Sequence, residues 1–176
     1  RDADGNRKPA PNLLVKASLI AQIMGDAFWR VKLVEIFDRP AAPTRVHQAL
    51  AALPNVWIIT TNYDRLMEQA LSSLGRNPRV VLATSREQLS MMESGDVLKL
   101  HGDLDRPETL VLTREDYLEM SHGIADAWKE RLKSWLQPPF QLLLVGYGYG
   151  YDDIDVHPMF QEIRYAYGKM LPGSFW

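Results

Sequence analysis

The sequence predicts an α/β protein with a mostly parallel sheet and flanking helices. Short apolar, β-branched runs alternate along the chain with segments whose apolar residues recur at helical spacing. A continuously apolar run is typical of a parallel strand covered on both faces, and strands that alternate with helices indicate β-α-β connections. The length of 176 residues fits a single domain, 1–176.

The amino-terminal part of the chain is predicted to be helical. A polar segment, 1–12, is expected to be a loop. Helices are predicted over 13–24, 27–37 and 45–53. The first two of these helices should pack together, and we interpret 13–53 as a small helical insert.

The remaining segment, 56–176, is predicted to form the core of the α/β fold. Strands are predicted over 56–60, 79–83, 97–100, 109–112 and 141–145. Helices are predicted over 64–74, 85–92, 114–120, 124–136 and 154–167. Most strands are followed by a helix, which is the connection that a parallel sheet requires.

The composition excludes several classes of site and partner. The chain has no cysteine, which excludes a disulfide framework and a Cys-ligated zinc site. Its formal net charge of -2 gives no electrostatic reason to expect nucleic acid or an anionic membrane as a partner. No apolar run approaches the roughly 20 residues that a membrane helix needs. We expect a cytoplasmic protein with no bound metal.

Three predicted strands end in polar or glycine-rich turns, which read "TTNYD", "LHGD" and "VGYGYGYDD". Ligands of open α/β sheets bind beyond the carboxyl ends of the strands. A strand that only fills a core needs no such ending, so the three turns indicate a ligand crevice. Taken alone, "TTNYD" is also explained as a helix cap, because Thr, Asn and Asp satisfy free backbone N–H groups.

Four motifs in order, "TTNYDRLME", "KLHGD", "LTREDYLEM" and "LLLVGYGYGYDDIDV", together resemble the sirtuin-like domains of bacterial proteins. These domains belong to the wider silent-information-regulator family. The resemblance covers roughly 56–167 and implies a Rossmann-like core. It also implies NAD+ as the substrate, with the polar strand ends facing the nicotinamide half.

The resemblance implies a role for each strand-end residue. Asn62 lies near the nicotinamide ribose, Asp64 near the carboxamide pocket, and His101 over the ribose as the proton acceptor. Asn62 and His101 are then the catalytic pair. The implied cofactor-binding residues are Thr60, Thr61, Asp64, Gly102, Gly146, Tyr147 and Gly148, of which the last three face the adenosine half.

These residue types suit the chemistry. Cleavage of the bond between nicotinamide and ribose passes through an oxocarbenium-like state, as glycoside cleavage does. Nicotinamide leaves from a cationic ring, so no strong acid is needed. An amide such as Asn62 can position a water or hydroxyl, and a histidine such as His101 can accept a proton near neutral pH.

Each assignment has a structural alternative. His101 could be a core histidine bonded to a neighbouring carbonyl, and Asp64 could simply cap the next helix. The glycine- and tyrosine-rich turn at 146–153 could bind nothing.

The chain departs from the family in three places. Protein-deacetylating sirtuins carry two Cys pairs for a structural zinc, so the resemblance favours the zinc-free branch, whose members typically hydrolyse NAD in bacterial defence against phage. The family's opening strand and Gly-Ala-Gly-x-Ser loop, which holds the NAD phosphates, do not precede Leu13. We therefore expect 1–176 alone to hydrolyse NAD poorly. Gly148 stands where the family usually has a hydroxyl residue.

The sequence thus predicts an NAD+ glycohydrolase, the effector domain of a prokaryotic antiphage protein. We expect it to form a homo-oligomer and to act with a sensor domain or partner protein. The alternative is a catalytically silent sirtuin-like module for nucleotide binding or assembly. A generic Rossmann-like nucleotide binder is a weaker hypothesis, because no G-x-G-x-x-G follows a strand.

Overall fold

The computed structural model describes residues 12–122, 125–135 and 143–146, together with Pro158, Gln161 and Tyr165. The strands are β1 (Ile58–Thr60), β2 (Val80–Leu82) and β3 (Val97–Lys99). The α-helices are α1 (Leu13–Met24), α2 (Asp26–Phe37), α3 (Arg45–Ala51), α4 (Leu66–Ser73), α5 (Arg86–Ser90), α6 (Arg114–His122) and α7 (Ala125–Trp135). A 3-10 helix, η1 (Pro107–Thr109), precedes α6.

The strands form a parallel sheet in the order β1-β3-β2, which confirms the predicted α/β class. The central strand, β3, is fully buried along its length. Thr60 of β1 and Leu82 of β2 both lie opposite Lys99, so the three strands end at the same level. Segments that follow the three strands therefore begin at one edge of the sheet.

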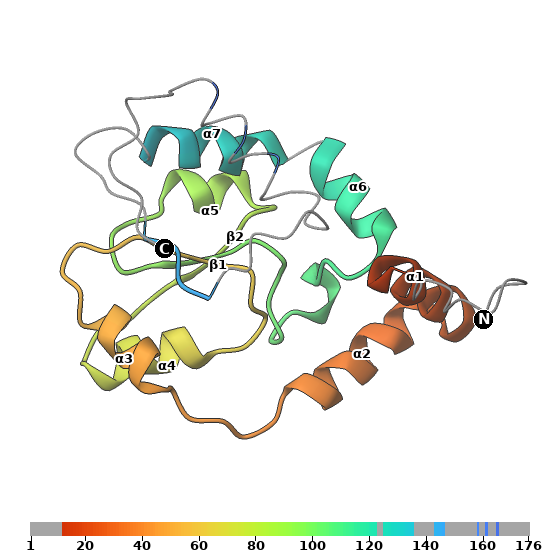
Figure 1. Ribbon diagram of the computed structural model, residues 1–176, viewed down its shortest axis with the longest axis horizontal. Helices are drawn as coiled ribbons and strands as arrows, with labels where there is room; N and C mark the ends of the chain where they lie inside the picture. The colour runs from red at the N-terminus through yellow and green to blue at the C-terminus, as the bar shows by residue number, and fades with distance from the viewer. Residues whose placement is uncertain are drawn as a thin grey trace, which may run out of the picture.

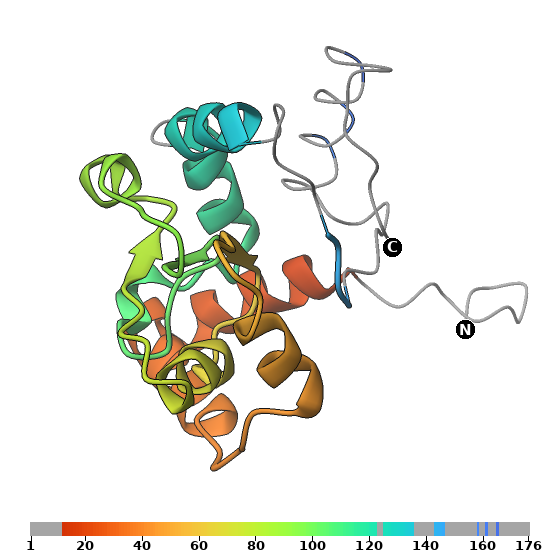
Figure 2. The ribbon, with the colours of Figure 1, turned by 90° about the vertical axis from the view of Figure 1, so that its left-hand side faces the viewer.

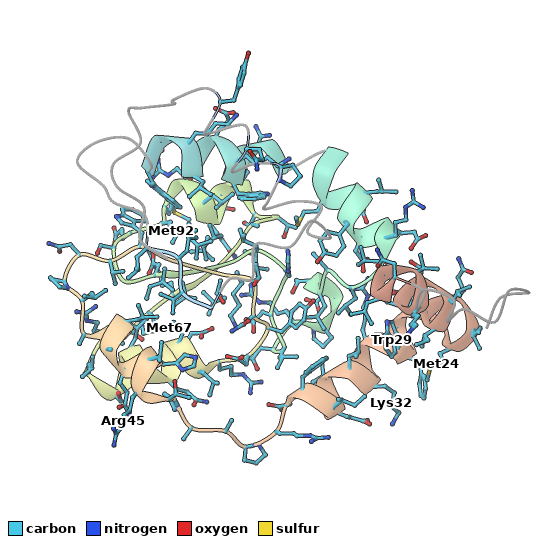
Figure 3. The ribbon with its side chains drawn as sticks, viewed as in Figure 1. Met24, Trp29, Lys32, Arg45, Met67 and Met92 are labelled. Carbon is cyan, nitrogen blue, oxygen red and sulfur yellow. The ribbon has the colours of Figure 1, made fainter. Side chains whose placement is uncertain are left out.

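Helices cover both faces of the sheet, giving three layers (Figure 1, Figure 2). Val97 packs with residues of α3 and α4 on one face, whereas Leu98 and Leu100 pack with residues of α5, α6 and α7 on the other. This split follows from the alternation of side chains along β3. Met67 and Met92 lie on opposite sides of the sheet (Figure 3).

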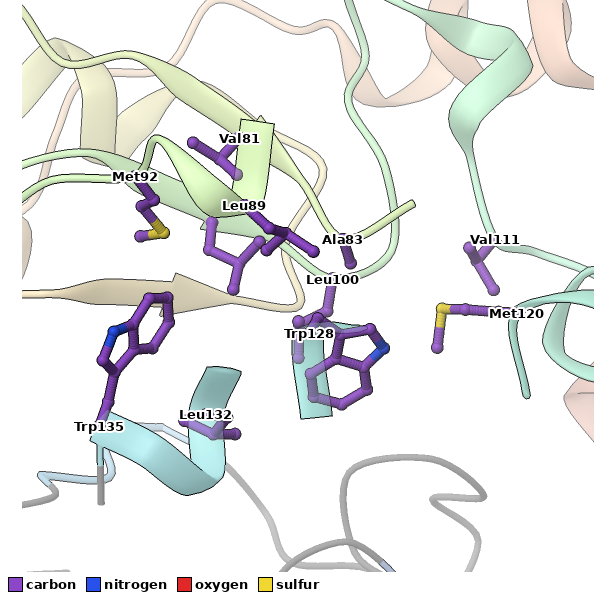
Figure 4. Packing of buried hydrophobic residues seen from close by; sticks show 11 residues of the cluster. Val81, Ala83, Leu89, Met92, Leu100, Val111, Met120, Trp128, Leu132 and Trp135 are labelled. Atoms are coloured by element: carbon purple, nitrogen blue, oxygen red, sulfur yellow. The ribbon is translucent and has the colours of Figure 1, made fainter. Parts of the chain in front are cut away.

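The larger of the two apolar cores lies between the sheet and α7 (Figure 4). Among the described residues, Trp128 is the largest side chain that is fully buried, and Trp135 packs its ring 4.7 Å from that of Trp57. Burial of a large aromatic side chain removes about 150–250 Å² of surface from water. The helix α7 is therefore fixed against the sheet by its tryptophans.

Helices α1 and α2 pack together, and they also pack against α6 and η1 (Figure 1). Arg30 of α2 is buried at this contact and donates to the carbonyl of Leu110, to Asp116 at 2.5 Å and to Asp26 at 2.7 Å. The predicted helices of this part of the chain are thus confirmed as helices. Arg30 ties α2 to the segment that leads into α6.

The predicted strand at 109–112 is wrong. Its first residue ends η1, and Leu110, Val111 and Leu112 are in no strand. The Val111 N–H donates to the carbonyl of His101 at 2.9 Å, as a strand residue would. Side chains take the neighbouring carbonyls, however: Arg30 binds that of Leu110, and the Tyr63 hydroxyl binds that of Val111 at 2.9 Å. These two carbonyls are therefore bonded to side chains and not to the backbone of a neighbouring strand.

Two other predicted elements fall largely outside the described residues. Of 141–145, only Leu143 to Val145 are described; Leu143 forms a single β-bridge and the next two are in no strand. Of 154–167, three residues are described, Pro158, Gln161 and Tyr165, and each is helical. No helix within the described ranges combines the length and apolarity needed to cross a membrane.

Candidate functional site

The candidate site lies beyond the carboxyl ends of β1 and β3. These strands are neighbours, and their connections leave for opposite faces of the sheet: α4 follows β1 onto one face, and α6 and α7 follow β3 onto the other. Such a divergence is the topological switch point, where open α/β sheets bind their ligands. We call the residues 60–64 after β1 the first turn, and the residues 100–103 after β3 the second turn.

The two turns are hydrogen-bonded to each other. Leu100 N–H donates to the carbonyl of Thr60 at 2.9 Å, and the N–H of Leu104, directly after the second turn, donates to that of Tyr63 at 3.2 Å. The structure therefore brings together the predicted residues of both turns, although the sequence separates them by about 40 positions. Those residues are Thr60, Thr61, Asn62, Asp64, His101 and Gly102.

In the first turn, local hydrogen bonds hold the backbone in place. The hydroxyl of Thr60 accepts from Asn62 N–H at 3.0 Å, and the Asp64 carboxylate accepts from Leu66 N–H at 3.0 Å, at the start of α4. Asp64 thus holds the first N–H of α4, although the N-cap position itself is occupied by Arg65. Asn62 is exposed, whereas its neighbours Thr61 and Tyr63 are half-buried. This turn presents an amide side chain to solvent at the sheet edge.

In the second turn, His101 is 8% exposed and its ring meets that of Tyr117 edge-on, with ring centroids 5.3 Å apart. Gly102 has φ +91°, and a Cβ there would overlap the backbone of Thr109 and Leu110. A glycine is therefore required for the chain to pass under η1 and present His101 at this edge. Its place in the fold gives Gly102 a structural role, whatever it binds.

Lys99, the last residue of β3, was not identified from the sequence. Its side chain is 0% exposed, and Nζ donates to the carbonyls of Tyr63 at 3.2 Å and Asp64 at 2.7 Å. It also donates to Asp103 at 3.1 Å and forms an ion pair with Glu68 of α4 at 2.8 Å. One buried ammonium thus contacts both turns. The signal available in the sequence was a lysine inside the otherwise apolar run "VLKL".

The first turn is also tied to the end of α2. Arg65 donates to Asp105 at 2.7 Å and to Asp38 at 2.9 Å. The hydrogen bond with Asp105, opposed by partial burial, raises the pKa of Arg65 further above its ordinary value. The rings of Phe37 and Tyr63 lie 6.1 Å apart. These contacts fix the α1–α2 pair beside the candidate site.

The glycine-rich turn is described only at its start. Gly146 is exposed, with φ +68°. Tyr147 and Gly148, which the sequence assigned to the adenosine half of a dinucleotide, lie outside the described residues. Of the predicted site residues, the structure therefore brings together those of the first and second turns, and it describes Gly146 alone of the glycine-rich turn.

Comparison with known proteins identifies relatives over the same segment. Residues 56–176 match a family described as the SIR2-like domain. A protein named NAD(+) hydrolase ThsA from Cytobacillus dafuensis is 33% identical over 138 residues, which are 78% of this chain and 27% of that relative. A protein of the same name from Enterococcus faecium is 30% identical over 139 residues, 76% of the chain and 28% of the relative.

A third relative, named Defense-associated sirtuin 2, comes from Bacillus subtilis. It is 27% identical over 141 residues, which cover 78% of this chain and 13% of the relative. The chain thus spans less than a third of the length of each of these three relatives.

Proposed function

The chain belongs to the family of SIR2-like domains, and from that premise we propose that the protein carrying it is an NAD+ glycohydrolase of prokaryotic antiphage defence. The observation that carries the proposal is the switch point. An exposed amide, Asn62, and a histidine, His101, follow adjacent parallel strands whose connections diverge. Relatives named for NAD(+) hydrolysis and for defence share this segment.

The proposed reaction breaks the bond between nicotinamide and its ribose. The side chain of Asn62 orients the attacking water toward the ribose carbon as positive charge develops there. The imidazole of His101 accepts the proton, either from that water or from a ribose hydroxyl. Thr60, Thr61, Asp64 and Gly102 shape the wall around the nicotinamide end, and the segment Gly146-Tyr147-Gly148 receives the adenosine half.

Several further properties belong to the same proposal. The protein acts in the cytoplasm, where its substrate is plentiful, and uses no metal. It assembles as a homo-oligomer, and a sensor domain or partner protein controls it, because uncontrolled NAD+ hydrolysis would stop the metabolism of its own cell.

The competing hypothesis is a catalytically silent module that binds nucleotides or supports assembly. One observation favours it: Thr60 and Asp64 use their side chains to hold their own turn. A silent module needs no proton acceptor, so the two hypotheses differ at His101.

The test is therefore nicotinamide release from NAD+ by the protein that carries this chain, with His101→Ala beside it. Loss of a general base costs ~100-fold or more in rate, so we expect His101→Ala to remove most of the activity. His47→Ala is the matched control, because His47 bonds the Thr44 hydroxyl at 2.8 Å at the start of α3, on another part of the fold. A chelator should leave turnover unchanged. Equal turnover in wild type and His101→Ala would refute the assigned role, and absence of nicotinamide release would favour the silent module.

A further inference from the structure

We propose that Lys99 is a positioning residue for this reaction: its buried ammonium holds the turn that carries Asn62 and the turn that carries His101 in one fixed arrangement. The inference rests on the proposed function, since it concerns the same site. Lys99 is not a catalytic residue, because its side chain is 0% exposed and so offers no surface to a substrate.

The contacts of Lys99 lie next to the catalytic pair in sequence. The carbonyls of Tyr63 and Asp64, which Nζ binds at 3.2 Å and 2.7 Å, immediately follow Asn62. The carboxylate of Asp103, bound at 3.1 Å, belongs to the residue two positions after His101. Rotation of any of these groups would move the adjacent side chain. The ammonium therefore acts as a common reference point for both turns.

A lysine at this fully buried position lowers stability unless its charge is compensated. Burial of an ammonium carries a large desolvation cost, and well-packed apolar residues often give as much stability as a buried ion pair, or more. Val97, on the same face of β3, is the kind of residue that packing alone would favour. Backbone carbonyls that turn inward need a donor, however, and an apolar side chain has none. Orientation of the turns, rather than stability, explains the lysine.

The surrounding charges support the same conclusion. Glu68 of α4 and Asp103 both pair with Lys99, and Arg106 lies 3.6 Å from Asp103. Glu68 pairs with the ammonium as an ion pair without an aligned hydrogen bond, so its contact neutralises charge more than it fixes geometry. The hydrogen bonds of Lys99 go to the turns. Its ion pair with Glu68 offsets the cost of burial.

The test compares variants of the full protein that carries this chain. Lys99→Met keeps most of the length of the side chain and removes its charge, but it leaves Glu68 without its cation and Asp103 with only Arg106, 3.6 Å away. The double variant Lys99→Met with Glu68→Gln relieves that imbalance and preserves the fold if the single variant unfolds. Circular dichroism and Tm report folding, and nicotinamide release gives kcat and KM.

We expect the folded variant to lose at least ~100-fold in kcat, because a misplacement of about 1 Å can cost that much. KM should change much less, since Lys99 does not contact NAD+. The matched control is Asp96→Asn, which breaks the 2.7 Å ion pair between the buried Asp96 carboxylate and the half-exposed Arg79, just before the amino end of the same strand. It should lower Tm while kcat and KM stay unchanged.

The outcomes separate the two proposals. Wild-type kcat in a folded Lys99 variant overturns the positioning role and leaves the proposed function intact. An equal loss of kcat in Asp96→Asn also overturns it, because general destabilisation would then explain the effect. If the wild-type protein releases no nicotinamide, the proposed function fails, and this inference fails with it.

Discussion

Gly102 shows how one residue can be required by geometry alone. Its φ of +91° and the overlap of any Cβ with Thr109 and Leu110 act together, so Gly102→Ala should lower the free energy of unfolding by about 3 kcal/mol or more. Gly75 provides the control, because it has a similar φ of +74° and no atom within 4 Å of a built Cβ. Gly75→Ala should cost only about 1–2 kcal/mol.

Urea unfolding of the two variants measures the difference. If both glycine variants lose the same free energy, backbone conformation alone explains Gly102, and the close approach of η1 contributes nothing.

The sequence pointed to the candidate site residues but not to the residue that supports them. Asn62 and His101 could be proposed because polar side chains directly follow apolar strands. Lys99 was not, because its partners come from other segments: Glu68 lies on α4, and the carbonyls of Tyr63 and Asp64 belong to the first turn. The role of a buried charge depends on the groups that surround it in the folded protein. The sequence shows where Lys99 lies in the chain, but it does not show which groups surround its ammonium.

Among the helices, α6 has a carboxylate in its first turn, Asp116, that makes the stability of the fold depend on acid pH. The Asp116 carboxylate accepts from Leu112 N–H at 2.9 Å and Thr113 N–H at 2.8 Å, and it pairs with Arg30 at 2.5 Å. Burial alone would raise the pKa of Asp116, but the two N–H groups and Arg30 outweigh burial and lower it. The ionised form therefore stabilises the fold.

The lowered pKa of Asp116 determines how the stability of the fold changes with pH. A carboxylate whose pKa is lowered in the folded state contributes its full stability above the ordinary aspartate pKa, about 3.9, and loses it as the pH falls through the folded value. Wild-type stability should thus fall from about pH 5 downward, and Asp116→Asn should fall less. At neutral pH the variant should be about 1–3 kcal/mol less stable.

Urea unfolding across this pH range checks the prediction. Glu119→Gln, on the exposed side of α6, is the control and should keep the wild-type acid sensitivity. A parallel decline in wild type and Asp116→Asn would contradict the assignment of acid sensitivity to this carboxylate.

Element prediction succeeded where the pattern was local and failed where distant side chains decided the outcome. The predicted helix at 13–24 matches α1, because Asn12 caps it and the apolar spacing continues to Met24. The segment 109–112 has a strand-like composition, yet Arg30 and Tyr63 occupy its carbonyls. Neither side chain is near that segment in the sequence, so composition alone could not exclude a strand.

In the molecule as a whole, the strand order brings the residues of the candidate site together. The alternation of strands and helices predicted a parallel sheet, but it did not predict that β3 lies between β1 and β2. That order places the first and second turns side by side and sends their connections to opposite faces. The fold alone hosts many activities, so the function depends on the residues at this edge.

We propose that NAD+ is cleaved at the carboxyl ends of β1 and β3, with Asn62 as a catalytic residue. The most direct test is nicotinamide release by the protein that carries this chain, compared between wild type, Asn62→Ala and Asn77→Ala. Asn77 is also an exposed asparagine, but it precedes β2 at the opposite edge of the sheet. We predict a loss of at least ~100-fold for Asn62→Ala, the low end for a positioned catalytic group, with Tm unchanged and with Asn77→Ala as active as wild type. Wild-type turnover in Asn62→Ala would contradict the account.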